Sequence, residues 1–155
     1  LNARLYRWSV NLTTGDTREG KLDDQWNAEF PTWNNSKMGS PMKYAYCTHI
    51  VTEPLMHFAG LIKFDLETGS SEYYTEGDHF TYSESPFAPA DNAASEDHGY
   101  LISFVRNKQV DRSEVHIFDA QALQTGPICK LILPCRVPEG FHATWARGDL
   151  LGLSA

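Results

Sequence analysis

The sequence repeats a short strand-and-turn pattern at a constant spacing. In the first two copies hydrophobic and polar residues alternate, which places the hydrophobic set on one face of a strand. A turn containing Thr-Gly follows each of the three strands, and the third turn is longer. The copies lie at about residues 4–15, 60–69 and 113–126. They align on Asn11, Asp65 and Asp119, which are 54 residues apart in both cases. A period of this size, built from short strands, is typical of the blades of a β-propeller.

Other hydrophobic stretches flank the repeated strands and complete the pattern. They occupy residues 42–47, 72–75, 100–105 and 128–133, and no window shows a convincing helical periodicity. The chain is therefore expected to be all-β. An ordinary β-sandwich whose hairpins happen to have similar lengths stays open as the alternative.

The length limits how much of a propeller this chain can form. A closed ring needs about 4–8 blades, and 155 residues at this period supply fewer than three. An open arc would expose the faces that neighbouring blades bury. We therefore expect residues 1–155 to be the C-terminal portion of a single propeller domain, with the remaining blades supplied by upstream sequence. We expect this portion not to fold as a closed unit by itself.

Composition excludes several classes of protein. With 13 basic and 20 acidic residues the net charge is −7, which argues against a nucleic-acid-binding protein. A hydrophobic content of 41% argues against intrinsic disorder, and no run approaches the roughly 18 hydrophobic residues that a membrane-spanning helix needs. The three cysteines have neither disulfide-framework nor zinc-site spacing, so a reducing, cytoplasmic location is expected.

None of the six histidines lies in a local metal-binding motif. His98 lies in a turn, where a solvated loop residue is the simplest interpretation, and His116 alternates with Phe118 on a strand, as a partly buried imidazole with a satisfied partner would. His142 differs, because aromatic residues flank it, Pro138 and Gly140 precede it, and no acid is adjacent. A buried core histidine and a metal ligand both stay open for His142.

Two glutamates stand in hydrophobic surroundings bounded by prolines. Glu29 precedes Phe30-Pro31, and Glu84 lies within Tyr82–Pro89. A buried carboxylate is costly unless a donor reaches it, and the second nitrogen of a metal-ligating histidine is one such donor. The alternative, acids at strand ends or turns, is also compatible with the sequence.

Taken in order, six segments resemble the carotenoid cleavage oxygenase family, which includes apocarotenoid oxygenases and lignostilbene dioxygenases. They cover nearly the whole chain: Leu5–Trp8, Glu29–Pro31, Lys43–Tyr46, Glu84–Pro89, Glu96–Val105 and Arg136–Trp145. One departure is His98, which replaces the second Asp of the family's Glu-Asp-Asp-Gly turn. Each segment is weak by itself, but the ordered set is specific.

The resemblance implies a seven-bladed propeller with a non-haem iron(II), Fe(2+), held on its axis by four histidines from different blades. His142 matches the last of these ligands, so the other three would lie upstream and this portion would be inactive alone. Glu84 and Glu29 match glutamates that accept a hydrogen bond from ligand histidines. We expect Glu84 to pair with His142, and Glu29 with a histidine outside this chain.

The resemblance also implies a reaction, in which dioxygen cleaves a conjugated double bond of an apolar polyene to give two carbonyl products. An apocarotenoid or carotenoid substrate is expected, within a tunnel to which Phe141, Trp145 and Phe87 would contribute. Packing between blades is an equally good role for these three residues. Peripheral membrane contact follows only from the lipophilic substrates. A stilbenoid-cleaving dioxygenase and a non-catalytic propeller that binds a partner are the alternatives.

Overall fold

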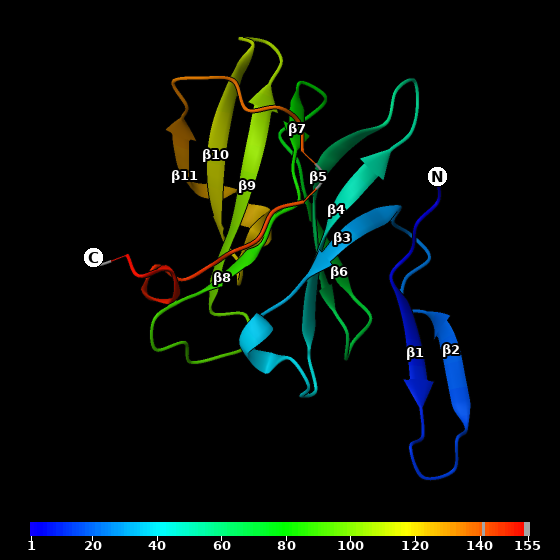
Figure 1. The fold of residues 1–155 in the computed structure, drawn as a ribbon. Helices are drawn as coiled ribbons and strands as arrows, with labels where there is room; N and C mark the ends of the chain where they lie inside the picture. The colour runs from blue at the N-terminus through cyan, green and yellow to red at the C-terminus, as the bar shows by residue number, and fades with distance from the viewer. Residues whose placement is uncertain (141, 154–155) are drawn as a thin grey trace.

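The structure, a computed structural model, describes residues 1–140 and 142–153. These residues form three antiparallel sheets and three short 3-10 helices, so the chain is all-β, as the sequence predicts (Figure 1). The first sheet is a hairpin of β1 (Tyr6–Val10) and β2 (Thr17–Lys21). The second has the order β3-β4-β5-β6, and its strands are Ala28–Thr32, Tyr44–Val51, His57–Asp65 and Ser71–Tyr74.

The third sheet has the order β11-β10-β9-β7, with β8 also paired to β9. Its strands are β7 (Phe80–Tyr82), β8 (Phe87–Pro89), β9 (Gly99–Asn107), β10 (Arg112–Asp119) and β11 (Pro127–Ile132). The 3-10 helices are η1 (Asn35–Lys37), η2 (Leu123–Thr125) and η3 (Asp149–Leu151).

All the strands that the sequence predicts occur in the structure, which also contains four strands that were not predicted. The repeated strands correspond to β1, β5 and β10, and the flanking stretches to β4, β6, β9 and β11. The strands without a sequence signal are β2, β3, β7 and β8. All four strands are short. In addition, β2 is polar, and β3 and β8 contain proline, so pairing with neighbouring strands rather than local preference makes them extended.

The first two repeated turns have the same hydrogen bonds. The side chains of Asn11 and Asp65 each accept from the backbone N–H groups two and three residues later. Gly15 and Gly69 then donate back to the carbonyl oxygens of Asn11 and Asp65, with φ angles of 79° and 74°. Only glycine adopts such angles without strain. The third turn begins in the same way at Asp119 but contains η2.

The main hydrophobic core lies between the second and third sheets. It contains Tyr46, Leu61, Tyr82, Phe87, Leu101, Val105, Phe118, Ala120 and Leu123. A smaller core on the opposite face of the second sheet contains Ala28, Cys47, Ile62 and Phe64. Because both of its faces are covered, β4 is buried continuously from residue 45 to 48, whereas β9 alternates and leaves Tyr100 and Phe104 exposed.

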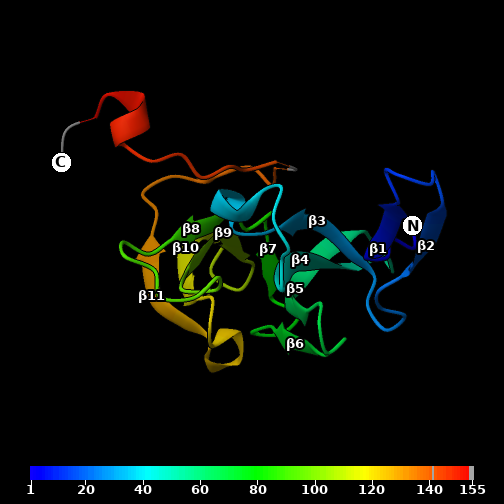
Figure 2. The same ribbon diagram turned by 90° about the horizontal axis from the view of Figure 1, so that it is seen from below.

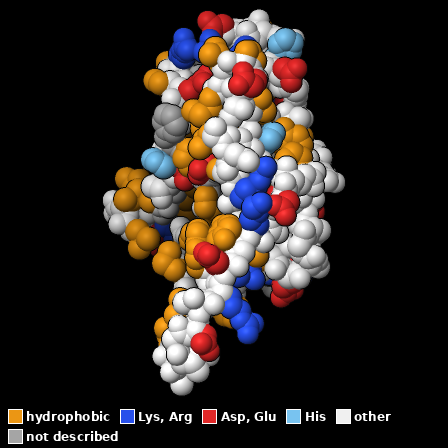
Figure 3. All heavy atoms as spheres, turned by 90° about the vertical axis from the view of Figure 1, so that its right-hand side faces the viewer, with side chains coloured by type: hydrophobic (Ala, Val, Ile, Leu, Met, Phe, Trp, Pro, Cys, Tyr) orange, Lys and Arg blue, Asp and Glu red, His pale blue; other side chains and the backbone are white. Residues whose placement is uncertain are grey.

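Two segments extend from this body. The β1–β2 hairpin projects as a narrow lobe (Figure 3) and exposes Trp8, Val10 and Leu12. Residues 133–140 and 142–147, which we call the C-terminal strap, leave β11, cross the ends of β10, β9 and β7, and then turn back along one side of the sheets (Figures 1 and 2). Within the described part of the chain, no helix has the length and hydrophobicity needed to cross a bilayer.

Candidate functional site

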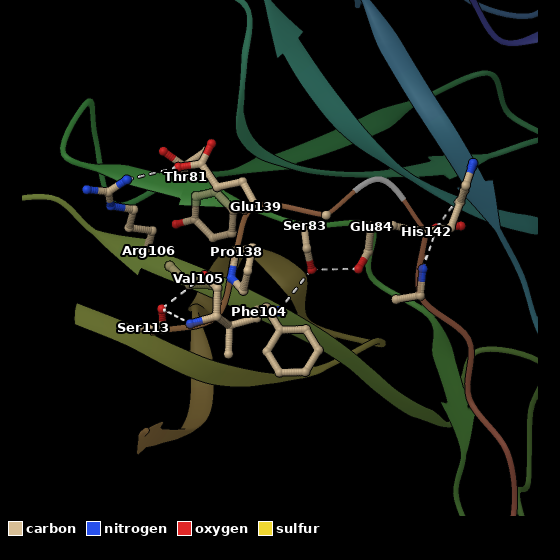
Figure 4. A pocket seen from close by; sticks show the side chains of 14 residues that line it. Thr81, Ser83, Glu84, Phe104, Val105, Arg106, Ser113, Pro138, Glu139 and His142 are labelled. Atoms are coloured by element: carbon tan, nitrogen blue, oxygen red, sulfur yellow. Dashed lines mark hydrogen bonds and ion pairs between the residues drawn. The ribbon is translucent and has the colours of Figure 1, made fainter. Parts of the chain in front are cut away.

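The structure brings Glu84 and His142 together, although they lie 58 residues apart in the chain. Nδ1 of His142 is 3.2 Å from Oε2 of Glu84, and the backbone N–H of Ala143 donates to the same oxygen at 2.7 Å (Figure 4). Glu84 lies in the connection between β7 and β8, and His142 lies in the C-terminal strap. Two adjacent groups of the strap, the His142 imidazole and the Ala143 backbone N–H, therefore contact the same carboxylate oxygen.

The connection that carries Glu84 is itself bonded to the third sheet. The hydroxyl of Ser83 donates to the Glu84 carbonyl at 2.8 Å and accepts from the Phe104 backbone N–H of β9 at 3.0 Å. The Ser85 hydroxyl donates to the Ser83 carbonyl at 3.1 Å. The Glu84 side chain is only 15% exposed, so its carboxylate needs donors to offset desolvation. His142 and Ala143 supply them.

Phe30 also contacts the imidazole, although the sequence analysis assigned it no role in the site. A bulge between Glu29 and Thr32 shifts the register of β3 against β4, and Phe30 takes a left-handed φ of 54° there. Its ring lies edge-to-face with the His142 ring at 5.3 Å and with the Phe58 ring at 5.2 Å. Such a φ is uncommon for a bulky residue and persists where surrounding contacts determine it. The Pro31 that follows is the only local signal of an irregular strand.

Glu29 lies on β3, opposite Thr48, and is half-buried. In the described ranges, the backbone N–H of Phe30, at 3.4 Å, is the hydrogen-bond donor found for its carboxylate, and no histidine reaches it. Burial, together with the negative charge of Glu29, raises the pKa of the Cys47 thiol to about 12. The pairing of Glu29 with a histidine outside the chain stays a prediction.

The three residues predicted for a substrate tunnel have different surroundings. Phe87 is 3% exposed in the main core, where its ring stacks on Tyr46 at 5.7 Å, so it fills the packing role that was left open for it. Trp145 is 42% exposed on the C-terminal strap. Phe141 lies outside the described residues.

The His142 imidazole, with Glu84 on its Nδ1, fits one ligand of a shared metal centre. A proton on Nδ1 of His142 makes the contact with Glu84 a hydrogen bond to carboxylate and leaves the lone pair of Nε2 available, as in metal-ligating histidines with a carboxylate partner. The His142 side chain is 81% exposed. Across residues 1–140 and 142–153, no three or more His, Cys, Asp or Glu side chains lie close enough together to hold a metal ion.

The other two histidines that the sequence drew attention to have structural partners. His116 is fully buried, with Nε2 at 2.8 Å from Glu114 and Nδ1 at 3.6 Å from Glu76. Burial alone would raise the pKa of Glu114, but the hydrogen bond and charge of His116 outweigh it, and the pKa lies below its usual value. His98 is not simply solvated, because it is half-buried and its Nδ1 accepts from the Ala94 backbone N–H at 3.1 Å.

Comparison with known sequences identifies relatives over almost the entire chain. The family model described as retinal pigment epithelial membrane protein (RPE65) matches residues 1–147. The chain is 32% identical over 162 residues to carotenoid 9,10(9',10')-cleavage dioxygenase 1 of Pisum sativum, covering 95% of the chain and 29% of that protein. It is 34% identical over 147 residues to a carotenoid cleavage oxygenase of Mycobacterium tuberculosis, covering 92% and 29% respectively.

Solved structures of similar proteins have the same fold over this region. The cobalt-substituted apocarotenoid oxygenase of Synechocystis superposes with a TM-score of 0.84 at 25% identity, covering 93% of this chain and 30% of that one. The lignostilbene dioxygenase of Pseudomonas brassicacearum superposes with a TM-score of 0.81 at 26% identity, covering 92% and 32%. The chain thus spans about 30% of the length of the proteins it matches. Its sheets are blades of their β-propeller, and the chain belongs to the RPE65 and carotenoid cleavage oxygenase family.

Proposed function

We propose that the protein containing this chain is an iron(II)-dependent dioxygenase that cleaves a conjugated double bond of an apocarotenoid or carotenoid. One molecule of dioxygen supplies the oxygen atoms of the two carbonyl products, so the reaction needs no external reductant. The hydrogen bond between Glu84 and His142 carries the proposal for this chain, because it prepares a neutral imidazole as a metal ligand. Family membership supplies the class of reaction.

In this proposal His142 is one of the residues that hold the iron, and iron(II), when bound, supplies the activation of dioxygen. Glu84 holds the proton at Nδ1 of His142, which keeps Nε2 directed toward the metal. Phe30 packs edge-to-face against the ring and limits its rotation. Glu29 would orient a further histidine in the same way. Trp145 and Phe141 would line the apolar path of the substrate.

A stilbenoid substrate is the second candidate. The chain is 28% identical to lignostilbene-alpha,beta-dioxygenase isozyme III of Sphingomonas paucimobilis, over 97% of its length and 33% of that protein. The higher identities, 32% and 34%, are to enzymes named for carotenoid cleavage, which favours the polyene. A propeller that only binds a partner is the non-catalytic alternative.

The full-length protein tests these candidates. After anaerobic reconstitution with iron(II), we expect about one iron per chain by elemental analysis, and His142→Ala should retain almost none, since one ligand is lost. Wild-type protein incubated separately with an apocarotenoid, a carotenoid and a stilbenoid should give aldehyde products, identified by mass spectrometry, from one of the first two.

The outcomes separate the alternatives. Aldehydes from the stilbenoid alone would select the second candidate. Wild-type protein that takes up no iron and cleaves nothing would favour the binding protein. Normal iron content and turnover in His142→Ala would remove His142 from the site.

A further inference from the structure

A row of three side chains lies beneath the first part of the C-terminal strap. Thr81 of β7 pairs in register with Arg106 of β9, which pairs in register with Ser113 of β10, so all three share one face of the sheet. Together with strap residues they line a pocket of about 160 Å³ that extends to Glu84 and His142 (Figure 4). The strap therefore lies over a specific row of polar groups before it reaches the candidate ligand.

Ser113 binds the strap most closely. Its hydroxyl accepts from the Val137 backbone N–H at 2.9 Å and donates to the Val137 carbonyl at 3.4 Å. Its own carbonyl accepts from the Leu133 N–H at 3.0 Å, where the strap leaves β11. Ser113 is 3% exposed. One buried residue thus bonds the strap at two points, and a serine hydroxyl can donate and accept at the same time.

Arg106 provides a second and weaker attachment. Its Nη1 is 3.6 Å from Oε1 of Glu139, and its Nη2 is 2.8 Å from Oδ1 of Asp111. Both carboxylates are substantially exposed, and ion pairs of this kind contribute little to stability. Thr81 is 2% exposed and its hydroxyl has no partner in the described structure, so it adds no direct bond to the strap. Ser113 is therefore the main anchor of the row.

We propose that Ser113 is a positioning residue for His142, an inference that rests on the proposed role of His142 as an iron ligand. Val137 precedes His142 by five positions, so its attachment determines from which direction the strap approaches Glu84. With Glu84 alone, the strap could pivot about a single carboxylate oxygen that bonds only His142 and Ala143. With Ser113 as well, the backbone is held both at Val137 and at Ala143, and the imidazole is presented in one orientation.

The full-length protein, reconstituted with iron(II), tests the inference through metal release as well as turnover. Iron release to an excess of a coloured chelator should be about 10-fold faster for Ser113→Ala than for the wild type, at the low end of the loss seen for outer partners of metal ligands. Ser113→Thr keeps the hydroxyl and should restore a slow release. In cobalt-substituted protein, Ser113→Ala should also change the visible cobalt spectrum, which reports ligand geometry.

Ser71→Ala is the matched control. The Ser71 hydroxyl accepts a hydrogen bond from Trp26 Nε1 at 2.9 Å, on the outer strand β6 and away from the strap. This substitution removes one partly buried hydrogen bond without touching the strap, so iron release and the cobalt spectrum should stay as in the wild type. A loss of general stability alone would affect both variants.

The outcomes distinguish this inference from the proposed function. If His142→Ala releases iron no faster than the wild type, the proposed role of His142 fails. If His142→Ala loses iron but Ser113→Ala behaves as Ser71→Ala, only the role of Ser113 is overturned. If Ser113→Ala fails to fold, Ser113→Cys replaces it, because cysteine is close to serine in volume but is only a weak hydrogen-bonding group. The expected results are again faster iron release and a changed cobalt spectrum.

Discussion

Oε2 of Glu84 lies 3.2 Å from Nδ1 of His142 and joins the connection between two strands of the third sheet to a strap that follows its last strand. The same oxygen accepts the Ala143 backbone N–H at 2.7 Å. The carboxylate therefore bonds the strap, and in the proposed function it also selects the nitrogen of the imidazole that stays free. Substitutions at this carboxylate should affect both.

Glu84→Gln tests this relationship in the full-length protein. The amide keeps the shape of the side chain but removes the negative charge that favours a proton at Nδ1 of His142. We expect iron retention against a chelator to fall by roughly 10–100-fold, the range typical when an outer partner of a metal ligand is lost.

Glu67→Gln is the control for charge, because Glu67 lies in an exposed turn and pairs with Lys43 at 3.2 Å. It should leave iron retention unchanged. Equal retention in the wild type and Glu84→Gln would contradict the role assigned to Glu84.

Gly99→Ala tests the packing of β8 against β9. A Cβ atom at Gly99 would lie 2.5 Å from the Ala88 carbonyl oxygen and 2.5 Å from the Phe87 ring. Neither atom can move freely, because Ala88 is in the ladder and Phe87 is in the main core. We expect a loss of about 1–3 kcal/mol in the free energy of unfolding, as for other overpacked sites.

Gly20→Ala on β2 is the control for Gly99→Ala, because it adds the same methyl group at another strand glycine. A Cβ atom at Gly20 of β2 would meet nothing within 4 Å, so Gly20→Ala should change the free energy of unfolding by less than about 0.5 kcal/mol. Urea denaturation of both variants measures the difference. Equal stabilities would show that β8 adjusts to the extra methyl group.

Asp97→Asn tests a buried ion pair between β5 of the second sheet and the connection from β8 to β9. Nζ of Lys63 is 2.9 Å from Oδ2 of Asp97, and both side chains are less than 10% exposed. Burial by itself raises the pKa of Asp97, but hydrogen bonds from Lys63 and Ser95 and the charge of Lys63 outweigh it, and the pKa lies below 3.8. Near neutral pH we expect a loss of about 3–5 kcal/mol, because Lys63 is left buried without its partner.

The pH dependence of this loss has a definite sign. A carboxylate whose pKa is lowered by folding contributes its full stability above the ordinary value of 3.8 and loses it as the pH falls toward the folded value. The stability difference between the wild type and Asp97→Asn should therefore shrink below pH 3.8. Asp91→Asn, at a carboxylate that is 92% exposed, should show almost no difference at any pH. A constant difference for Asp97→Asn would refute the linkage.

Cys47 should resist alkylation in the folded protein. It is 4% exposed, and burial with the nearby charge of Glu29 raises the pKa of its thiol to about 12, so little thiolate is present near neutral pH. Peptide mapping after treatment with iodoacetamide should find Cys47 unmodified in native protein and modified after unfolding in urea. Rapid modification of the native protein would show that the second sheet opens.

Local sequence patterns were sufficient to predict the long strands and the repeated turns. Alternation with a period of two is a property of neighbouring residues, and with the flanking hydrophobic stretches it located β1, β4, β5, β9 and β10. The Asx turns at Asn11 and Asp65 also depend on only a few adjacent residues. The short strands β7 and β8 had no such signal, because pairing with β9 makes them extended.

The sequence by itself determined the all-β class and the repeated strand-and-turn pattern, because both depend on residue type and short-range spacing. The choice of His142 and Glu84 as a pair came from the resemblance of six ordered segments to the family. Only the tertiary structure decided which atoms of Glu84 and His142 meet and at what distance, that a bulge turns Phe30 onto the same ring, and that Ser113 bonds the strap. These contacts join residues 24 to 112 positions apart. Their distances depend on the order of the strands and the path of the strap, which no local pattern contains.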